Sequence, residues 1–151
     1  MIRAYVGPEI IDPAEVLDSI GAEEDGAAIL FLGVVRNHAD GRSVKGMHYD
    51  AYVEMARPVL AEIADEAAAR LGTDRLAVVH RVGELAVGEV SVAIAVSSPH
   101  RAESYDASRY VIEEIKKRLP IWKKERYADG DTVWVEGTIP PGTGTIVEGR
   151  T

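Results

Sequence analysis

Cysteine is absent from this chain of 151 residues, and so is any long hydrophobic run. Without cysteine there can be no disulfide bond, no thiolate metal site and no cysteine nucleophile. No stretch approaches the roughly 18 consecutive apolar residues that a membrane span needs, and the first residues lack the apolar core of a signal peptide. We therefore expect a cytoplasmic protein that does not enter a membrane.

The sequence also lacks the motifs of several enzyme classes. It contains no P-loop, no G-x-G-x-x-G dinucleotide fingerprint and no Ser-centred nucleophile elbow. His38, His48 and His80 have neither the i, i+4 spacing nor the carboxylate motif of a metal site. We expect no metal and no cofactor, and we interpret these histidines as loop residues or as hydrogen-bonded residues of a sheet.

Charge is distributed unevenly along the chain. The formal net charge of -8 argues against a nucleic-acid partner. Between residues 98 and 126, however, eight Lys and Arg residues accompany five acidic ones, whereas the remainder of the chain has nine basic and twenty acidic residues. An acidic protein with one basic segment suggests a local site for a small anion.

Periodicity and turn signals predict one domain over residues 1–136. Alternating and continuous apolar patterns predict strands at residues 2–6, 27–35, 44–52, 76–82, 89–97, 121–127 and 132–136. Caps and three-to-four spacing predict helices at residues 13–20, 54–71 and 99–119. The short links favour an α+β architecture with antiparallel pairing, and an α/β topology is the alternative.

Several details of this architecture can be predicted as well. The strands at 27–35 and 44–52 are expected to form a hairpin, and Asp129-Gly130 predicts a second one. The strand at 89–97 is expected to be central because both its faces are small or apolar. Residues 137–151 are rich in Gly, Thr and Pro, and we interpret them as a flexible C-terminal tail that a partner orders.

The start of the last predicted helix has an unusual charge. Ser98 and Pro99 are expected to be its N-cap and first residue, which would put His100 and Arg101 in the first turn. The helix dipole disfavours each cation there by about 0.3–1 kcal/mol. A bound anion would reverse this effect, because helix N-termini and Arg side chains both suit phosphate. The alternative is a solvated basic pair. The inner face of this helix is predicted to carry Tyr105, Ser108, Ile112 and Ile115.

Two lysines near the end of the same helix are candidates for chemistry. Lys116 lies in the predicted last turn, and Lys123 follows seven residues later, after Pro120 has ended the helix. If both ammonium groups reach one pocket, their mutual repulsion makes a lysine a useful acid, base or nucleophile near neutral pH. The alternative is that Lys116 only complements the helix dipole. Arg36, directly after a buried strand, could bind an anion at the mouth of a cleft, or simply lie in water.

Five motifs in this order resemble the large, catalytic subunit of molybdopterin synthase. They are FLGVVRNH at 31–38, YDAY at 49–52 followed by EMA at 54–56, HRVG at 80–83, VSSPHR at 96–101 and PIWKKE at 120–125. The resemblance covers roughly residues 1 to 136. It implies a hammerhead-like fold, a homodimer of large subunits and a small ubiquitin-like subunit at each end, which makes a heterotetramer.

The resemblance also implies a reaction. The small subunit would insert its thiocarboxylated Gly-Gly tail into the pocket and pass its sulfur to cyclic pyranopterin monophosphate, and two such transfers would give the dithiolene of molybdopterin. Because the chain has no cysteine, sulfur would have to arrive on such a partner.

By the same resemblance, particular positions acquire roles. Lys116 and Lys123 match the catalytic positions. Arg36, His100 and Arg101 match positions that bind the pterin phosphate, the last two across the dimer interface. The neighbouring substrate-contact positions are Val34, Val35, Lys124 and Glu125.

Two other functions are compatible with the basic segment. The first is a regulatory module that binds a phosphorylated ligand without consuming a thiocarboxylated partner. The second is a Schiff-base enzyme in which Lys116 or Lys123 attacks a carbonyl, and borohydride trapping would detect it.

Overall fold

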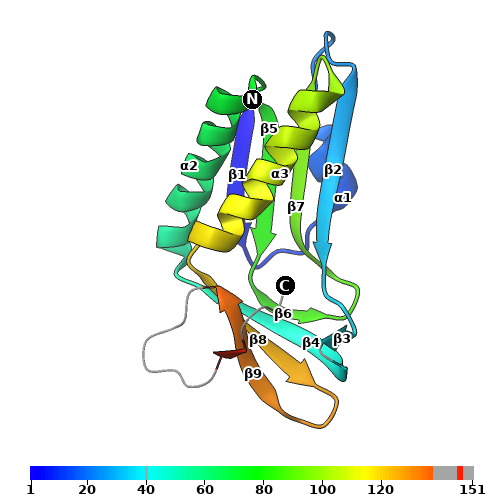
Figure 1. Cartoon of the computed structure of the whole chain (residues 1–151), viewed down its shortest axis with the longest axis vertical. Coiled ribbons are helices and arrows are strands. Elements are labelled where there is room, and N and C mark those ends of the chain that lie inside the picture. Colours follow the sequence, from blue (N-terminus) through cyan, green and yellow to red (C-terminus); the bar gives the residue numbers. More distant parts are fainter. Residues whose placement is uncertain (40, 138–145, 148–151) are drawn as a thin grey trace.

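Two β-sheets, one above the other in Figure 1, and three helices make up the described chain. The structure, a computed structural model, describes residues 1–39, 41–137 and 146–147, with side chains up to residue 134. The helices are α1 (Pro13–Asp18), α2 (Val53–Leu71) and α3 (Arg101–Arg118). The strands are β1 (Ile2–Gly7), β2 (Ala27–Val34), β3 (His38–Ala39), β4 (Arg42–Ala51), β5 (Arg75–Arg81), β6 (Gly83–Ala86), β7 (Val90–Ser98), β8 (Ile121–Tyr127), β9 (Thr132–Gly137) and β10 (Ile146–Val147).

The first sheet has four strands in the order β1-β5-β7-β2. β1 is parallel to β5, and the other pairs are antiparallel. The alternation in β7 assigns Val92, Ile94 and Val96 to the face covered by α2 and α3, whereas Ala93 and Ala95 face α1 (Figure 1). β7 lies inside the sheet and is almost fully buried, which confirms its predicted central position.

The second sheet is built around β4, which pairs with β8 on one side and with β3 and β6 on the other. β8 and β9 form the predicted hairpin, and Gly130 in its turn has a φ of 94°, which suits glycine. β10 pairs in parallel with β9, so residues 146–147 of the expected tail belong to this sheet. Residues 138–145 and 148–151 of that tail lie outside the described residues.

The α+β class, with antiparallel sheets and a hairpin subdomain, is confirmed. α2 also ends at Leu71 as predicted, and Gly72 follows it in the left-handed region with a φ of 79°. Pro58 is the sixth residue of α2, just beyond its first turn. No helix in the described part of the chain is long and apolar enough to cross a membrane.

The predicted hairpin between residues 27–35 and 44–52 is wrong. β2 pairs along its whole length with β7 as the half-buried edge strand of the first sheet, and β4 belongs to the other sheet. A register shift between Gly33 and Val34 precedes the last pair of these strands, Val34 with Val90. The intervening loop contains instead the short β3–β4 hairpin.

The predicted start of α3 also needs correction. Ser98 is still part of β7, and the helix begins at Arg101 with His100 as an N-cap that makes no side-chain capping bond. The Ser98 hydroxyl is used elsewhere, because it donates to the His100 carbonyl at 2.6 Å and lies 2.5 Å from the Ser104 Oγ. Tyr105 is exposed, not on the inner face. The buried residues of α3 are Ser104, Ala107, Ser108, Val111 and Ile115.

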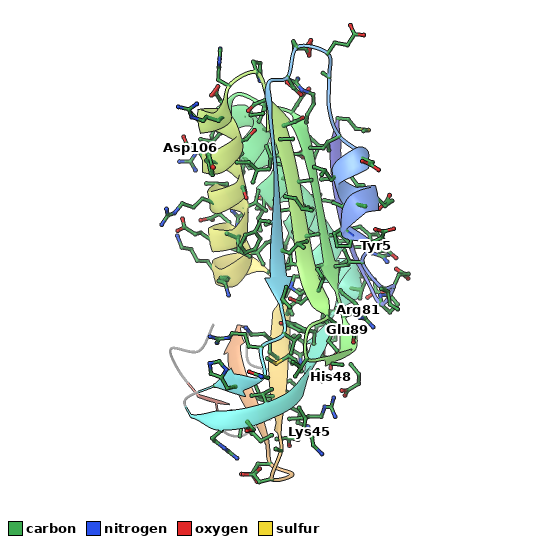
Figure 2. The ribbon with its side chains drawn as sticks, turned by 90° about the vertical axis from the view of Figure 1, so that its right-hand side faces the viewer. Tyr5, Lys45, His48, Arg81, Glu89 and Asp106 are labelled. Carbon is green, nitrogen blue, oxygen red and sulfur yellow. The ribbon has the colours of Figure 1, made fainter. Side chains whose placement is uncertain are left out.

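Ion pairs stabilise the region where the two sheets meet. Arg81, at the end of β5, donates to Glu89 at 3.1 Å, and Glu89 also accepts the Ala86 N–H at 2.7 Å. In the second sheet, the Nδ1 of His48 lies 2.9 Å from a carboxylate oxygen of Glu84 on the neighbouring strand. Figure 2 shows Arg81 and Glu89 at the lower end of the first sheet and His48 just below them.

Candidate active site

A cavity of about 160 Å³ lies at the junction of the two sheets. Residues of β2, β5, β7 and α3 form one part of its wall, and residues of β4 and β8 form the other. Most of the lining is apolar. The polar side chains in the lining are Tyr49, His80, Ser91, Lys116 and Lys123.

The structure brings Lys116 and Lys123 to the same cavity. Lys116 lies in the last turn of α3, and the helix stops at Leu119 because Pro120 follows. The chain then reverses into β8, where Lys123 is opposite Tyr49 of β4. A helix end and a strand of the other sheet therefore hold the two ammonium groups at one site.

The three predicted residues at the end of β2 have different environments. Val34 lines the cavity and is 48% exposed, whereas Val35 is buried in the main core. Arg36 follows directly and is exposed. It therefore lies two residues beyond a cavity-lining position.

Lys124 and Glu125, also predicted, are adjacent to Lys123 but do not line the cavity. The alternation of β8 turns Lys124 to the opposite face, where its ammonium lies 5.2 Å from the centre of the Trp134 ring. Glu125 is buried and accepts a hydrogen bond of 2.5 Å from the Tyr127 hydroxyl.

His100 and Arg101 lie far from the lysines of the same chain. Both are exposed at the N-terminal end of α3, whereas Lys116 is close to its C-terminal end. Fifteen residues of helix separate Arg101 from Lys116, which corresponds to about 22 Å along the axis. One chain alone does not bring the two groups together.

His80 belongs to this site, although the sequence indicated only a loop or sheet histidine. It is a buried residue of β5 that lines the cavity, and its ring meets the Tyr49 ring edge-on with 5.4 Å between centres. Burial lowers the pKa of His80 to about 4, and the positive charges of Lys123 and Lys116 contribute in the same direction. Its place at the end of a buried strand was the signal that could have identified it.

The cavity can perform a limited kind of chemistry. Two ammonium groups can bind an anion or stabilise negative charge that develops on a reacting oxygen, and the apolar wall strengthens these interactions by excluding water. Among the described residues, no group of three or more His, Asp or Glu could hold a metal ion. Fold and cavity together define a small α+β enzyme with a cationic pocket.

Comparison with known proteins identifies the family. The model of the family described as "MoaE protein" matches residues 6–118. The molybdopterin synthase catalytic subunit of Halalkalibacterium halodurans is 46% identical over 121 residues, which is 80% of this chain and 77% of that protein. The chain belongs to the MoaE family, that of the molybdopterin synthase catalytic subunits.

Solved structures agree with this assignment. The crystal structure of molybdopterin synthase from Staphylococcus aureus superimposes with a TM-score of 0.83 at 38% identity, covering 91% of this chain and 99% of that one. This match confirms the hammerhead-like fold. A complex of subunits 1 and 2 of the molybdopterin-converting factor from Helicobacter pylori has a TM-score of 0.66 at 23% identity, covering 85% and 86%, and shares the fold.

Proposed function

We propose that this chain transfers sulfur from the thiocarboxylated C-terminus of a small ubiquitin-like subunit to cyclic pyranopterin monophosphate. Two such transfers, each using one thiocarboxylate, form the dithiolene of molybdopterin. The observation that carries the proposal is the cavity in which Lys116 and Lys123 meet against apolar walls. Membership of the MoaE family supports the reaction class. The proposed catalytic domain comprises residues 1–136, and the expected location is the cytoplasm.

The proposed sulfur donor is a separate protein. This sequence contains no cysteine, so none of its own side chains can carry sulfur as a persulfide. The Helicobacter pylori structure of this fold is, by its title, a complex of two subunits of a molybdopterin-converting factor. A partner that delivers a narrow C-terminal tail suits a cavity that is open at the junction of the sheets.

Two lysines divide the proposed chemistry. The thiocarboxylate sulfur attacks a carbon of the pterin side chain and displaces an oxygen, whose developing negative charge Lys123 stabilises. The acyl C–S bond of the resulting thioester is then cleaved, which leaves the sulfur on the pterin. Lys116 acts as an acid and base for attack by water, or first accepts the acyl carbon, and hydrolysis returns the partner as a carboxylate. Their positions on separate elements support a division of labour, because each ammonium approaches the cavity from its own side.

Substrate binding requires a second copy of the chain in this proposal. Arg36 binds the pterin phosphate close to the cavity, and His100 and Arg101 reach the same phosphate from the second copy. The separation along α3 supports this arrangement, since these two residues cannot reach the lysines of their own chain. Each large subunit of the homodimer binds one small subunit. The proposed substrate-contact positions around the lysines are Val34, Val35, Lys124 and Glu125.

The test is to incubate the purified protein with cyclic pyranopterin monophosphate and a thiocarboxylated ubiquitin-like partner. Mass spectrometry should detect a dithiolene pterin, and the partner should return to its carboxylate form. A partner already known to be active with another synthase serves as the positive control. If that partner stays thiocarboxylated with this protein, the proposed reaction is wrong.

A further inference from the structure

His80 has a defined tautomer. Its Nδ1 lies 2.9 Å from the carbonyl oxygen of Arg81, and a carbonyl can only accept, so Nδ1 carries the proton. In the neutral ring, Nε2 is then an acceptor with a free lone pair. Nε2 makes no hydrogen bond to the described residues, and it is not among the fully enclosed polar atoms.

This acceptor belongs to a cavity whose other nitrogen groups are donors. Lys116 and Lys123 line the same cavity and carry N–H groups only. The Ser91 hydroxyl, also in the lining, donates to the Gly33 carbonyl at 3.3 Å. Because burial and the two lysine charges keep the pKa of His80 near 4, the ring is neutral at pH 7. An imidazolium, in contrast, would have no acceptor to offer.

We propose that Nε2 of His80 accepts a hydrogen bond from an N–H or O–H group of the bound pterin and so orients the substrate against Lys116 and Lys123. The inference rests on the proposed function for the identity of the substrate. Lysines and arginines can hold the anionic part of such a molecule, but only an acceptor can recognise its donor groups.

The geometry also explains why the ring is held rigidly. The Nδ1–H bond to Arg81 and the edge contact with Tyr49 fix the plane of the imidazole, so the direction of the Nε2 lone pair is fixed as well. A histidine with only a structural role would need the Nδ1 bond and the packing. It would not need an accessible lone pair in the cavity.

Two amide variants separate these roles. His80→Gln can present an oxygen near the position of Nε2 but gives up the Nδ1 donor, whereas His80→Asn keeps a donor for the Arg81 carbonyl and loses the acceptor. We expect about a tenfold rise in KM for the pterin with His80→Asn, as for the loss of one hydrogen bond, and less than about a threefold rise with His80→Gln. Circular dichroism and thermal unfolding verify that both variants fold.

The reverse order, with His80→Gln more impaired than His80→Asn, would indicate a structural role and overturn the proposal. Equal effects in the two variants, or none, overturn it too. Wild-type turnover measured in parallel distinguishes failure of the proposed function from failure of the proposed role of His80. If the wild type forms product while the variants show no such difference, only the His80 inference fails; if the wild type forms none, the proposed function fails.

A second measurement needs no variant. In wild-type protein labelled with ¹⁵N-histidine, the Nε2 resonance of His80 should shift towards that of a hydrogen-bonded acceptor when cyclic pyranopterin monophosphate is added without the partner. The Nδ1 resonance should stay that of a protonated nitrogen. An unchanged Nε2 resonance at a saturating concentration of the pterin contradicts the proposal.

Discussion

At the scale of single residues, two neighbouring lysines of α3 have different surroundings. Lys116 and Lys117 are neighbours at the end of α3, yet Lys116 lines the cavity while Lys117 is 70% exposed and pairs with Glu114. Sequence alone could not separate them, because both suit the negative end of a helix dipole. The structure makes Lys117 a natural control for its neighbour.

We expect Lys116→Ala to reduce product formation below detection while leaving the binding of the small subunit intact. Lys117→Ala should keep the wild-type rate, because its surface ion pair contributes little. Single-turnover assays with the thiocarboxylated partner, together with a binding titration of the same partner, measure both effects. Full activity of Lys116→Ala would refute its catalytic role.

A second residue-scale prediction concerns stability. The Asp25 side chain is 5% exposed, accepts two hydrogen bonds from the guanidinium of Arg75 and accepts one from the Ser97 hydroxyl at 2.8 Å. The pKa of Asp25 is lowered, mainly by Arg75. Arg75→Ala would leave this carboxylate without its partner, and we expect it to lower the free energy of unfolding clearly more than the loss of an exposed ion pair does.

Urea unfolding of this variant is the measurement. Arg3→Ala removes an exposed ion pair with Glu15 and should cost less than about 1 kcal/mol. If the two variants lost the same free energy of unfolding, the Arg75–Asp25 pair would stabilise the fold no more than an exposed ion pair does, and the prediction would be wrong.

At the scale of secondary-structure elements, ion pairs of Arg118 in α3 with Glu62 and Glu66 in α2 join the two helices. Glu66 of α2 accepts hydrogen bonds from both terminal nitrogens of Arg118 at 2.6 and 2.9 Å, and from the Tyr110 hydroxyl at 2.7 Å. Arg118 and then Tyr110 lower the pKa of Glu66 to about 2. The junction of the two helices therefore depends on a charge that acid removes.

The sign of the pH effect follows from the lowered pKa. Glu66 stabilises the folded state fully above its unfolded pKa near 4.5, and the contribution declines as pH falls towards about 2. We expect the acid limb of a plot of Tm against pH to be less steep in Glu66→Gln than in the wild type. Glu54→Gln, at the exposed start of α2, is the control. Parallel acid limbs for Glu66→Gln and the wild type would contradict the prediction.

Most elements could be predicted because local patterns determined them. The alternation of β7, the Asp12 cap of α1 and the Gly72 end of α2 are all readable in short windows of sequence. The wrong prediction concerns strand pairing between residues that are far apart in the sequence. β2 pairs with β7 and not with the next strand along the chain, and no local signal records that preference.

In the candidate site, too, the features set by local sequence could be predicted and those set by long-range packing could not. The meeting of Lys116 and Lys123 could be predicted because Pro120 reverses the chain between them. His80 was missed as a site residue because it reaches the cavity only through the packing of two sheets. The predicted helix already placed His100 and Arg101 at the opposite end from Lys116, and these two residues remain proposed residues of a second chain.

At the scale of the whole molecule, α3 keeps Arg101 away from Lys116 of the same chain, and this separation leads to a prediction about the proposed dimer. If each site combines lysines of one chain with Arg101 of the other, a mixture of Lys116→Ala and Arg101→Ala chains should recover activity. Half of randomly formed dimers are mixed, and each has one intact site, so about one quarter of all sites should work. The assay is turnover at a low pterin concentration, where each variant alone is inactive.

A matched control decides whether the recovery comes from shared sites. Lys116→Ala chains mixed with chains that carry both Lys116→Ala and Arg101→Ala contain no intact site and should show no recovery. If the first mixture is also inactive although mixed dimers form, the phosphate-binding residues do not come from a second chain.

The position of the cavity at the junction of the two sheets has a consequence for how the enzyme fails on heating. Its reacting groups come from α3 and from β8 of the second sheet, and a local opening that displaces them by about 1 Å is enough to misalign a reaction while the shared core stays packed. On heating, the catalytic activity should therefore be lost at a lower temperature than the one at which the chain unfolds. A thermal scan of fold alone would overstate the temperature range in which the molecule works.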